Sequence, residues 1–250
     1  MKMTILVFAI LLSQLSFAAK SKILVYRGPG GCNSCAGAAA EIFNTKKYNQ
    51  YKVEFVGKST LNKETLQDAV LWVQPAGNAI TAAKNLGEEN LSLLREFVKK
   101  GGNYLGFCAG AFLSDKFVDD DNEVMGINIL PFVTLDYEVN EEDNIDMTWI
   151  NWNGKKRHVF FNGGATFDLQ EQNQLLGIFK KEVPIRVIAT YEADGRPAVA
   201  QTTYGLGNVV ISGPHPEAPQ TWKDNNEVED EDGSDLDLAR QLADLALSRK

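Results

Sequence analysis

The sequence has few of the side chains that most often do chemistry, and it is short of positive charge. It has only two histidines and three cysteines among 250 residues, and its 25 lysines and arginines face 33 aspartates and glutamates, for a formal net charge of −8. Because binding to a phosphate backbone requires a basic surface, this charge argues against a nucleic-acid partner. A site built on cysteine or histidine must therefore draw on very few residues.

Long apolar runs are also scarce, and the one at the start of the chain is too short to span a membrane. Ile5–Leu12 follows Lys2 and precedes the small residues Ala18 and Ala19. A spanning helix needs roughly 20 apolar residues, so residues 1–19 are predicted to be a secretory signal peptide rather than a retained anchor, which is the alternative. We expect a periplasmic or secreted protein with one domain over residues 20–250 and no membrane span after cleavage.

The number of cysteines is odd, which matters in an oxidising compartment. Three cysteines predict one disulfide and one unpaired thiol, and Cys32 and Cys35 are the closest pair in sequence. Their C-x-x-C spacing is also compatible with a redox-active pair or with half of a metal site, although two further close ligands for a metal are not apparent. Our leading expectation is a disulfide that stiffens a loop beside a pocket, which leaves Cys108 unpaired and either buried or functional.

The order of elements predicts an α/β fold. The first half alternates predicted strands with predicted helices, the strands at 22–26, 51–56, 70–73 and 103–107 and the helices at 36–43, 64–69 and 91–100. This alternation predicts a mostly parallel sheet flanked by helices. The second half is rich in strands, at 127–139, 147–152, 156–161, 185–191, 198–203 and 208–211, before a closing helix at 235–247. The turns Asn153-Gly154 and Asp194-Gly195 predict hairpins, so these additional strands should be antiparallel and extend or flank the core sheet.

The segment Gly106-Phe107-Cys108-Ala109-Gly110 directly follows the fourth predicted strand. In doubly wound sheets ligands bind at the carboxyl ends of the strands. The pattern G-x-C-x-G is the cysteine form of a nucleophile elbow, in which small neighbours allow a strained turn and the next helix favours the thiolate. The alternative is a small buried thiol in a packed core, and the five residues alone do not decide between the two.

The two histidines differ in their surroundings. His158 lies in an alternating strand and is expected to be an ordinary strand residue, whereas His215 directly follows the strand at 208–211. Glu217 lies two residues further, so in an extended chain its carboxylate can meet one imidazole nitrogen while the other faces Cys108. A proline-rich surface turn is the alternative. Together the two motifs predict a catalytic triad of Cys108, His215 and Glu217.

G-x-C-x-G followed by a C-terminal H-P-E resembles the class I glutamine amidotransferase superfamily. Within it, the segments YRGPG, VQPAGN, GFCAGAFLS and SGPHPE resemble the biotin-protein ligase N-terminal-domain family. The resemblance implies a flavodoxin-like sheet, a thioester on Cys108, and an oxyanion hole made by the amides of Ala109 and Gly77. Ala76 replaces the first of two glycines that the family usually carries beside Gly77.

We therefore expect an exported cysteine hydrolase that acts on a small-molecule amide or peptide-like substrate, with no cofactor and no metal. Transfer of nitrogen to an acceptor is not expected, because the chain shows no synthetase domain. Two alternatives remain: a non-catalytic ligand-binding module with the same fold, and thiol-disulfide exchange through Cys32 and Cys35. Two acidic segments, Asp119–Glu123 and Glu227–Asp237, lack the ligand pattern of a calcium loop and are expected to be solvated charged faces.

Overall fold

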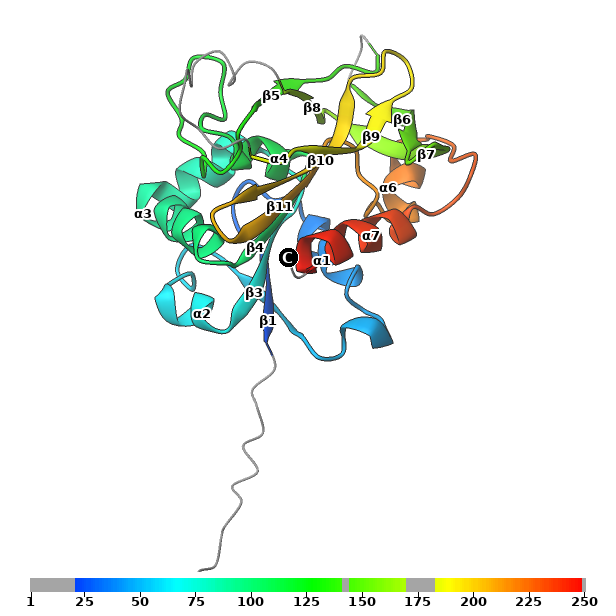
Figure 1. The fold of residues 1–250 in the computed structure, drawn as a ribbon. Coiled ribbons are helices and arrows are strands. Elements are labelled where there is room, and N and C mark those ends of the chain that lie inside the picture. The colour runs from blue at the N-terminus through cyan, green and yellow to red at the C-terminus, as the bar shows by residue number, and fades with distance from the viewer. Residues whose placement is uncertain (1–20, 141–143, 170–182, 249–250) are drawn as a thin grey trace, which may run out of the picture.

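The computed structural model describes residues 21–140, 144–169 and 183–248 (Figure 1). The predicted signal peptide lies outside these ranges. Within them, every helix is too short or too polar to cross a membrane. The elements follow in the order β1 (Lys22–Tyr26), α1 (Cys35–Glu41), η1 (Lys46–Tyr48), β2 (Lys52–Val56), α2 (Lys63–Gln67), β3 (Ala69–Gln74), α3 (Ala79–Lys99), β4 (Asn103–Phe107), α4 (Ala109–Ser114), β5 (Val133–Asp136), β6 (Ile145–Trp152), β7 (Lys155–Asn162), β8 (Ala165–Asp168), β9 (Arg186–Tyr191), β10 (Pro197–Tyr204), β11 (Gly207–Ser212), α6 (Gln220–Asn225) and α7 (Leu236–Leu247).

One large sheet organises the molecule, with the strand order β2-β1-β3-β4-β11-β10-β9-β6-β7. The first five strands in this order are parallel, which confirms the predicted α/β fold. β10, β9, β6 and β7 continue the sheet in antiparallel fashion, as expected for the second half. β11 is the exception among the late strands, because it pairs in parallel with β4 and so joins the two halves of the chain.

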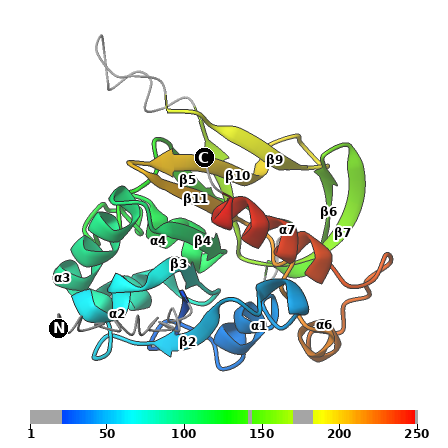
Figure 2. The ribbon, with the colours of Figure 1, turned by 60° about the horizontal axis from the view of Figure 1, so that its bottom comes forward.

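Two apolar cores cover the two faces of the parallel strands. α1 and α7 lie on one side of the sheet, and α2, α3 and α4 lie on the other (Figures 1 and 2). The central strands β3, β4 and β11 are buried on both faces, which explains why their sequences are nearly continuous apolar runs rather than alternating ones.

Two predicted boundaries were wrong. The strand expected at 127–139 is limited to β5, because Pro131 interrupts it and Asn128 has a positive φ of 59°. The amides of Ile127 and Ile129 instead donate to the end of α4, at Leu113 and Ser114. The helix expected at 91–100 begins earlier and forms the second part of α3.

α3 begins at Ala79 because the side chain of Asn78 accepts a hydrogen bond from the amide of Thr81 at 2.8 Å, an N-cap. Gly87, with φ 75° and ψ 165°, interrupts its helical geometry. The apolar periodicity is therefore broken in the middle of the element, and only its second part is visible in the sequence.

Candidate active site

Four loops meet at the carboxyl ends of the parallel strands. They follow β1, β3, β4 and β11, which are the places where a doubly wound sheet binds ligands. A cavity of about 260 Å³ lies there, and its lining residues are Cys32, Ser34, Cys35, Ala76, Gly77, Cys108, Phe160, Asn162, His215, Trp222, Asn225 and Asn226. The structure thus brings Cys108 and His215 to one cavity from two adjacent strands.

Cys108 occupies a strained turn between β4 and α4. Its backbone has φ 47° and ψ −105°, a conformation that residues with a Cβ rarely adopt. A Cβ on Gly106 would lie 2.5 Å from the carbonyl oxygen of Gly110, and one on Gly110 would lie 2.3 Å from that of Gln74. Both glycines are therefore required by close backbone packing, and the turn has the geometry of a nucleophile elbow.

The thiol of Cys108 is only 4% exposed. Its Sγ donates to the carbonyl oxygens of Asn162 at 3.5 Å and of Gly163 at 3.7 Å. Both acceptors belong to the end of β7 and the turn after it, so the hairpin of the second half forms one wall beside the thiol.

His215 and Glu217 form a buried pair. The His215 Nδ1 and Glu217 Oε1 atoms are 3.1 Å apart, and the amide of His215 donates to the carbonyl oxygen of Phe160. Burial alone lowers the pKa of His215, but the negative charge of Glu217 and the neighbouring Cys108 outweigh it and raise this pKa to about 10. The pair therefore favours a protonated ring next to the thiol.

Two atoms of this pair lack hydrogen-bond partners among the described residues, namely His215 Nε2 and Glu217 Oε2. With Nδ1 engaged by Glu217, Nε2 is the ring nitrogen left for the side of Cys108. Buried polar atoms are nearly always hydrogen-bonded, so these two atoms distinguish the pair from an ordinary core contact.

The two residues expected to donate to an oxyanion also lie at this edge. Ala109 is the first residue of α4, so its amide has no intrahelical acceptor. Gly77 lines the cavity with φ 142°, and a Cβ there would lie 1.9 Å from the carbonyl oxygen of Gly30. The loop after β3 therefore needs glycine at this position in order to pack against the loop after β1. The oxyanion role of the two amides stays a prediction.

Cys32 and Cys35 form the predicted disulfide, with Cα atoms 5.1 Å apart, and Cys108 is the free cysteine. The disulfide closes the loop after β1 and borders the cavity. Ser34, inside this loop, accepts a hydrogen bond at 2.7 Å from Nε1 of Trp222.

Trp222 is a site residue that the sequence did not reveal. It lies on α6, its ring packs at 5.7 Å from that of His215 in an edge-on arrangement, and it also contacts Phe160 at 6.0 Å. One feature of the sequence could have located Trp222. Pro219 is typical of a helix start, and it precedes a polar segment, α6, that contains this tryptophan. Asn162, which directly follows the predicted strand at 156–161, was also missed.

The acidic segment Glu227–Asp237 is not simply a solvated face, which corrects that expectation. Arg157 binds Asp232, Asp235 and Asp237, and the buried Lys223 of α6 binds Asp230. These ion pairs hold α6 against the molecule, beside α1 (Figure 2). In the other acidic segment, Asp119 accepts hydrogen bonds from the amides of Glu123 and Val124.

The remaining histidine has a structural environment. The ring of His158 stacks on Trp149 with centroids 4.5 Å apart, and its Nδ1 accepts from the amide of Glu231. Over residues 21–140, 144–169 and 183–248, no group of three or more histidine, cysteine, aspartate or glutamate side chains could hold a metal ion.

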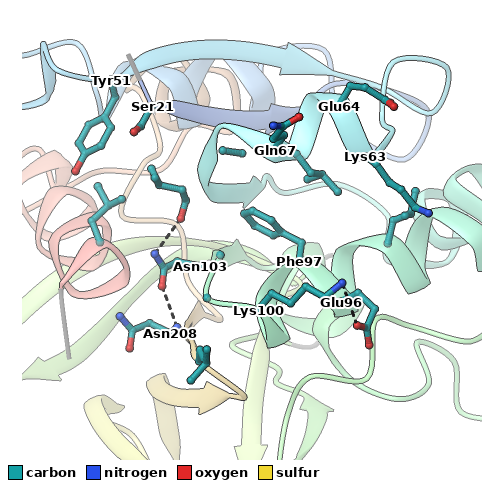
Figure 3. A pocket seen from close by; sticks show the side chains of 18 of the residues that line it. Ser21, Tyr51, Lys63, Glu64, Gln67, Glu96, Phe97, Lys100, Asn103 and Asn208 are labelled. Carbon is teal, nitrogen blue, oxygen red and sulfur yellow. Dashed lines mark hydrogen bonds and ion pairs between the residues drawn. The ribbon is translucent and has the colours of Figure 1, made fainter. Parts of the chain in front are cut away.

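A larger hollow of about 1720 Å³ lies at the opposite, amino ends of the parallel strands (Figure 3). There Asn103 donates to Val70 and accepts from the amide of Asn208, while Glu96 pairs with Lys100. Its lining residues include no cysteine or histidine. We therefore place the candidate site at the smaller cavity, which holds the reactive side chains.

Known proteins resemble this chain in both sequence and fold. A family described as "Biotin-protein ligase, N terminal" matches residues 21–249. A biotin–protein ligase of Schizosaccharomyces pombe is 28% identical over 217 residues, which cover 78% of this chain and 33% of the relative. The chain thus spans about a third of the length of that relative.

Three solved structures share the fold at low sequence identity. A glutamine amidotransferase has a TM-score of 0.58 at 18% identity, over 87% of this chain and 98% of its own. A glutamine amidotransferase from Thermotoga maritima has a TM-score of 0.50 at 18% identity, over 90% of each chain. An exo-β-1,4-mannosidase from Opitutaceae bacterium strain TAV5 has a TM-score of 0.52 at 11% identity, over 91% of this chain and 36% of its own.

Proposed function

We propose that this chain, which belongs to the biotin-protein ligase N-terminal family and has a glutamine amidotransferase-like fold, is a cysteine hydrolase of amide or peptide-like substrates. The ligase activity named for the S. pombe relative is not part of this proposal, because the chain covers only a third of that protein.

One observation carries the proposal: the strained Cys108 elbow and the buried His215–Glu217 pair share one cavity. A buried thiol in an ordinary core needs neither a left-handed backbone nor an ionisable pair beside it. Both features lower the stability of the fold, and strained backbones and perturbed ionisable groups cluster at active sites.

The geometry supports a two-step acyl transfer. Cys108 Sγ adds to the substrate carbonyl carbon, and the amides of Ala109 and Gly77 donate to the oxygen that becomes negative. His215 Nε2 then gives its proton to the leaving amine as the C–N bond breaks, which leaves a thioester on Cys108. His215 next takes a proton from water as the water attacks the thioester, which releases the acid and restores the thiolate–imidazolium pair. Glu217 holds the ring in position and stabilises its charge.

The proposal is tested by turnover of a panel of peptide and γ-glutamyl 4-nitroanilides. Cys108→Ala should leave the fold intact and lower kcat/KM by about 10³-fold or more, because it removes the atom that forms the thioester. His215→Asn should have a similar effect, whereas the matched control His158→Asn should retain turnover. Undiminished activity in Cys108→Ala would rule out the triad.

A second candidate, a non-catalytic ligand-binding module, is favoured by the contacts of the thiol. Cys108 Sγ donates to two carbonyl oxygens, as a neutral buried thiol does. The mannosidase shows that this fold also occurs as one part of a longer chain with another activity. Under this alternative, His215→Asn and Glu217→Gln would leave the affinity for a bound ligand unchanged.

We also propose that the chain is exported, and the disulfide supports export. Disulfides persist in oxidising compartments and are rare in the cytosol. The intact mass of the protein recovered from a periplasmic fraction should correspond to cleavage after Ala18 or Ala19. Recovery of the uncleaved chain from the cytosol would contradict export.

A further inference from the structure

All three cysteines of the chain line the same cavity. Cys35 and Cys108 are respectively 3% and 4% exposed and belong to one small buried cluster with Ala76, whereas Cys32 is exposed at the rim. A disulfide and the free thiol proposed as nucleophile therefore lie side by side. Nothing in amide hydrolysis requires that arrangement.

We propose that Cys108 exchanges with the Cys32–Cys35 disulfide, so that the cavity is a thiol-exchange site in which the nucleophile is reversibly masked. The inference rests on the proposed function in one respect, namely that His215 keeps Cys108 as a thiolate.

The step balances without an added oxidant or reductant. The Cys108 thiolate attacks Sγ of Cys35, a Cys35–Cys108 bond forms, and the Cys32–Cys35 bond breaks. Cys32 leaves as a thiolate and takes a proton from water. The protein holds one disulfide and one thiol before and after the step, and the reverse attack by Cys32 restores the nucleophile.

The burial of the sulfurs decides which of the two disulfide atoms is attacked. Cys35 is buried in the cluster that contains Cys108, so its sulfur is the one that we expect Cys108 to attack. Cys32 is exposed, so water solvates the departing thiolate, as a good leaving group requires. Its Sγ also lies 3.8 Å from the hydroxyl of Ser34, which offers a hydrogen bond to that thiolate.

The exchange would give the protein two states of equal overall oxidation. In one, Cys108 is free and the loop after β1 is closed by its own disulfide. In the other, Cys108 is blocked and an exposed thiol at Cys32 is open to small disulfides and thiols from solution. A small disulfide that exchanges with Cys32 would form a mixed disulfide there, release one thiol and hold Cys108 in the blocked state, and attack by a thiol on that mixed disulfide would reverse the capping.

The test maps the disulfide in the purified protein without reductant. Samples held at pH 4 and pH 8 are acid-quenched, denatured, labelled with N-ethylmaleimide and digested, and the labelled and cross-linked peptides are identified by mass spectrometry. About a tenth or more of the protein should carry label on Cys32 and a Cys35–Cys108 cross-link. This fraction should be no smaller at pH 4 than at pH 8, because the step converts a thiolate into a thiol and so takes up a proton. Label on Cys108 alone at both pH values would overturn the proposal.

Two matched variants locate the attacked atom. In Cys32→Ser, oxidised glutathione should drive a Cys35–Cys108 disulfide about tenfold faster than it drives a Cys32–Cys108 disulfide in Cys35→Ser. Equal rates, or glutathione adducts alone in both variants, would overturn the assignment. If either variant does not fold, the wild-type peptide map still decides.

The result separates this inference from the hydrolase proposal. Cross-linking without turnover of any amide would support exchange and count against hydrolysis. Turnover with label confined to Cys108 would support hydrolysis and count against exchange.

Discussion

Three residues carry the proposed chemistry, and each could be located in the sequence. Cys108, His215 and Glu217 directly follow buried strands, and the carboxyl ends of neighbouring parallel strands share one edge of a sheet. Local pattern therefore sufficed to predict one site from these residues, although it did not predict that β11 lies beside β4. Trp222 and Asn162 could not be located in the same way, because they reach the cavity only through α6 and the β6–β7 hairpin.

The reactivity of Cys108 should depend on His215. A positive charge on the ring stabilises negative charge on the neighbouring sulfur, so iodoacetamide should label Cys108 rapidly, and His215→Ala should slow this reaction about tenfold or more. His158→Ala is the matched control and should react at the wild-type rate. Peptide mapping of the labelled protein gives the rates, and a reaction independent of His215 would favour the binding module.

The raised pKa of His215 predicts a pH dependence of stability. Because this pKa is about 10 in the folded protein and near 6.5 in the unfolded chain, the pair stabilises the fold fully below about pH 6.5. This contribution is lost as the pH rises toward 10, by up to about 1.4 kcal/mol per pH unit for one proton. Glu217→Gln removes the carboxylate, so Tm should fall less between pH 7 and 10 in the variant than in the wild type. An equal fall in Tm between pH 7 and 10 in the wild type and in Glu217→Gln would contradict this account.

At the scale of elements, the sequence predicted the strands better than the helices. The buried strands are continuous apolar runs, so β1, β3, β4 and β11 fall close to their predicted positions. α6 was missed because its position depends on Lys223 and on acidic residues that follow it in sequence. Such an arrangement of charges leaves no periodic signal along the chain.

Lys223 should be the residue on which the position of α6 depends. Its side chain is 2% exposed and binds Asp230, while Asp235 lies 3.9 Å away. Lys223→Met would leave the buried carboxylate of Asp230 without its countercharge, whereas Asp235 keeps Arg157, and breaking a buried pair typically costs about 3–5 kcal/mol. Urea denaturation should show this loss, and Lys84→Met, on the exposed face of α3, should stay within about 0.5 kcal/mol of the wild type. A loss below about 1 kcal/mol in Lys223→Met would mean that α6 is held by other contacts.

At the scale of the whole molecule, a late strand lies among early ones in the nine-stranded sheet, and β5 and β8 form a separate two-stranded sheet. β11 pairs with β4 on one side and with β10 on the other, so neither half of the chain completes its own core. The sequence predicted that the strands of the second half would extend or flank the core sheet. The insertion of its last strand beside β4 was not predicted, because an apolar run such as Val209–Ile211 carries no information about its neighbours.

This topology predicts one cooperative unfolding transition. Trp72 lies in the first half of the chain and Trp149 and Trp152 lie in the second, so tryptophan fluorescence samples both. The urea transition followed by fluorescence should coincide with that followed by far-ultraviolet circular dichroism. Two separate transitions would indicate that the second half is an independent lobe and would contradict a single domain.

The pairing of β4 with β11 also has a consequence for the order of biosynthesis. The ribosome makes Cys32, Cys35 and Cys108 well before His215 and Glu217, and β4 has no neighbour on that side until β11 is complete. During this interval the nascent chain holds three cysteines without the base that distinguishes one of them. The choice of disulfide partner is therefore open until the last strand inserts, and the native pairing is fixed only in the finished chain.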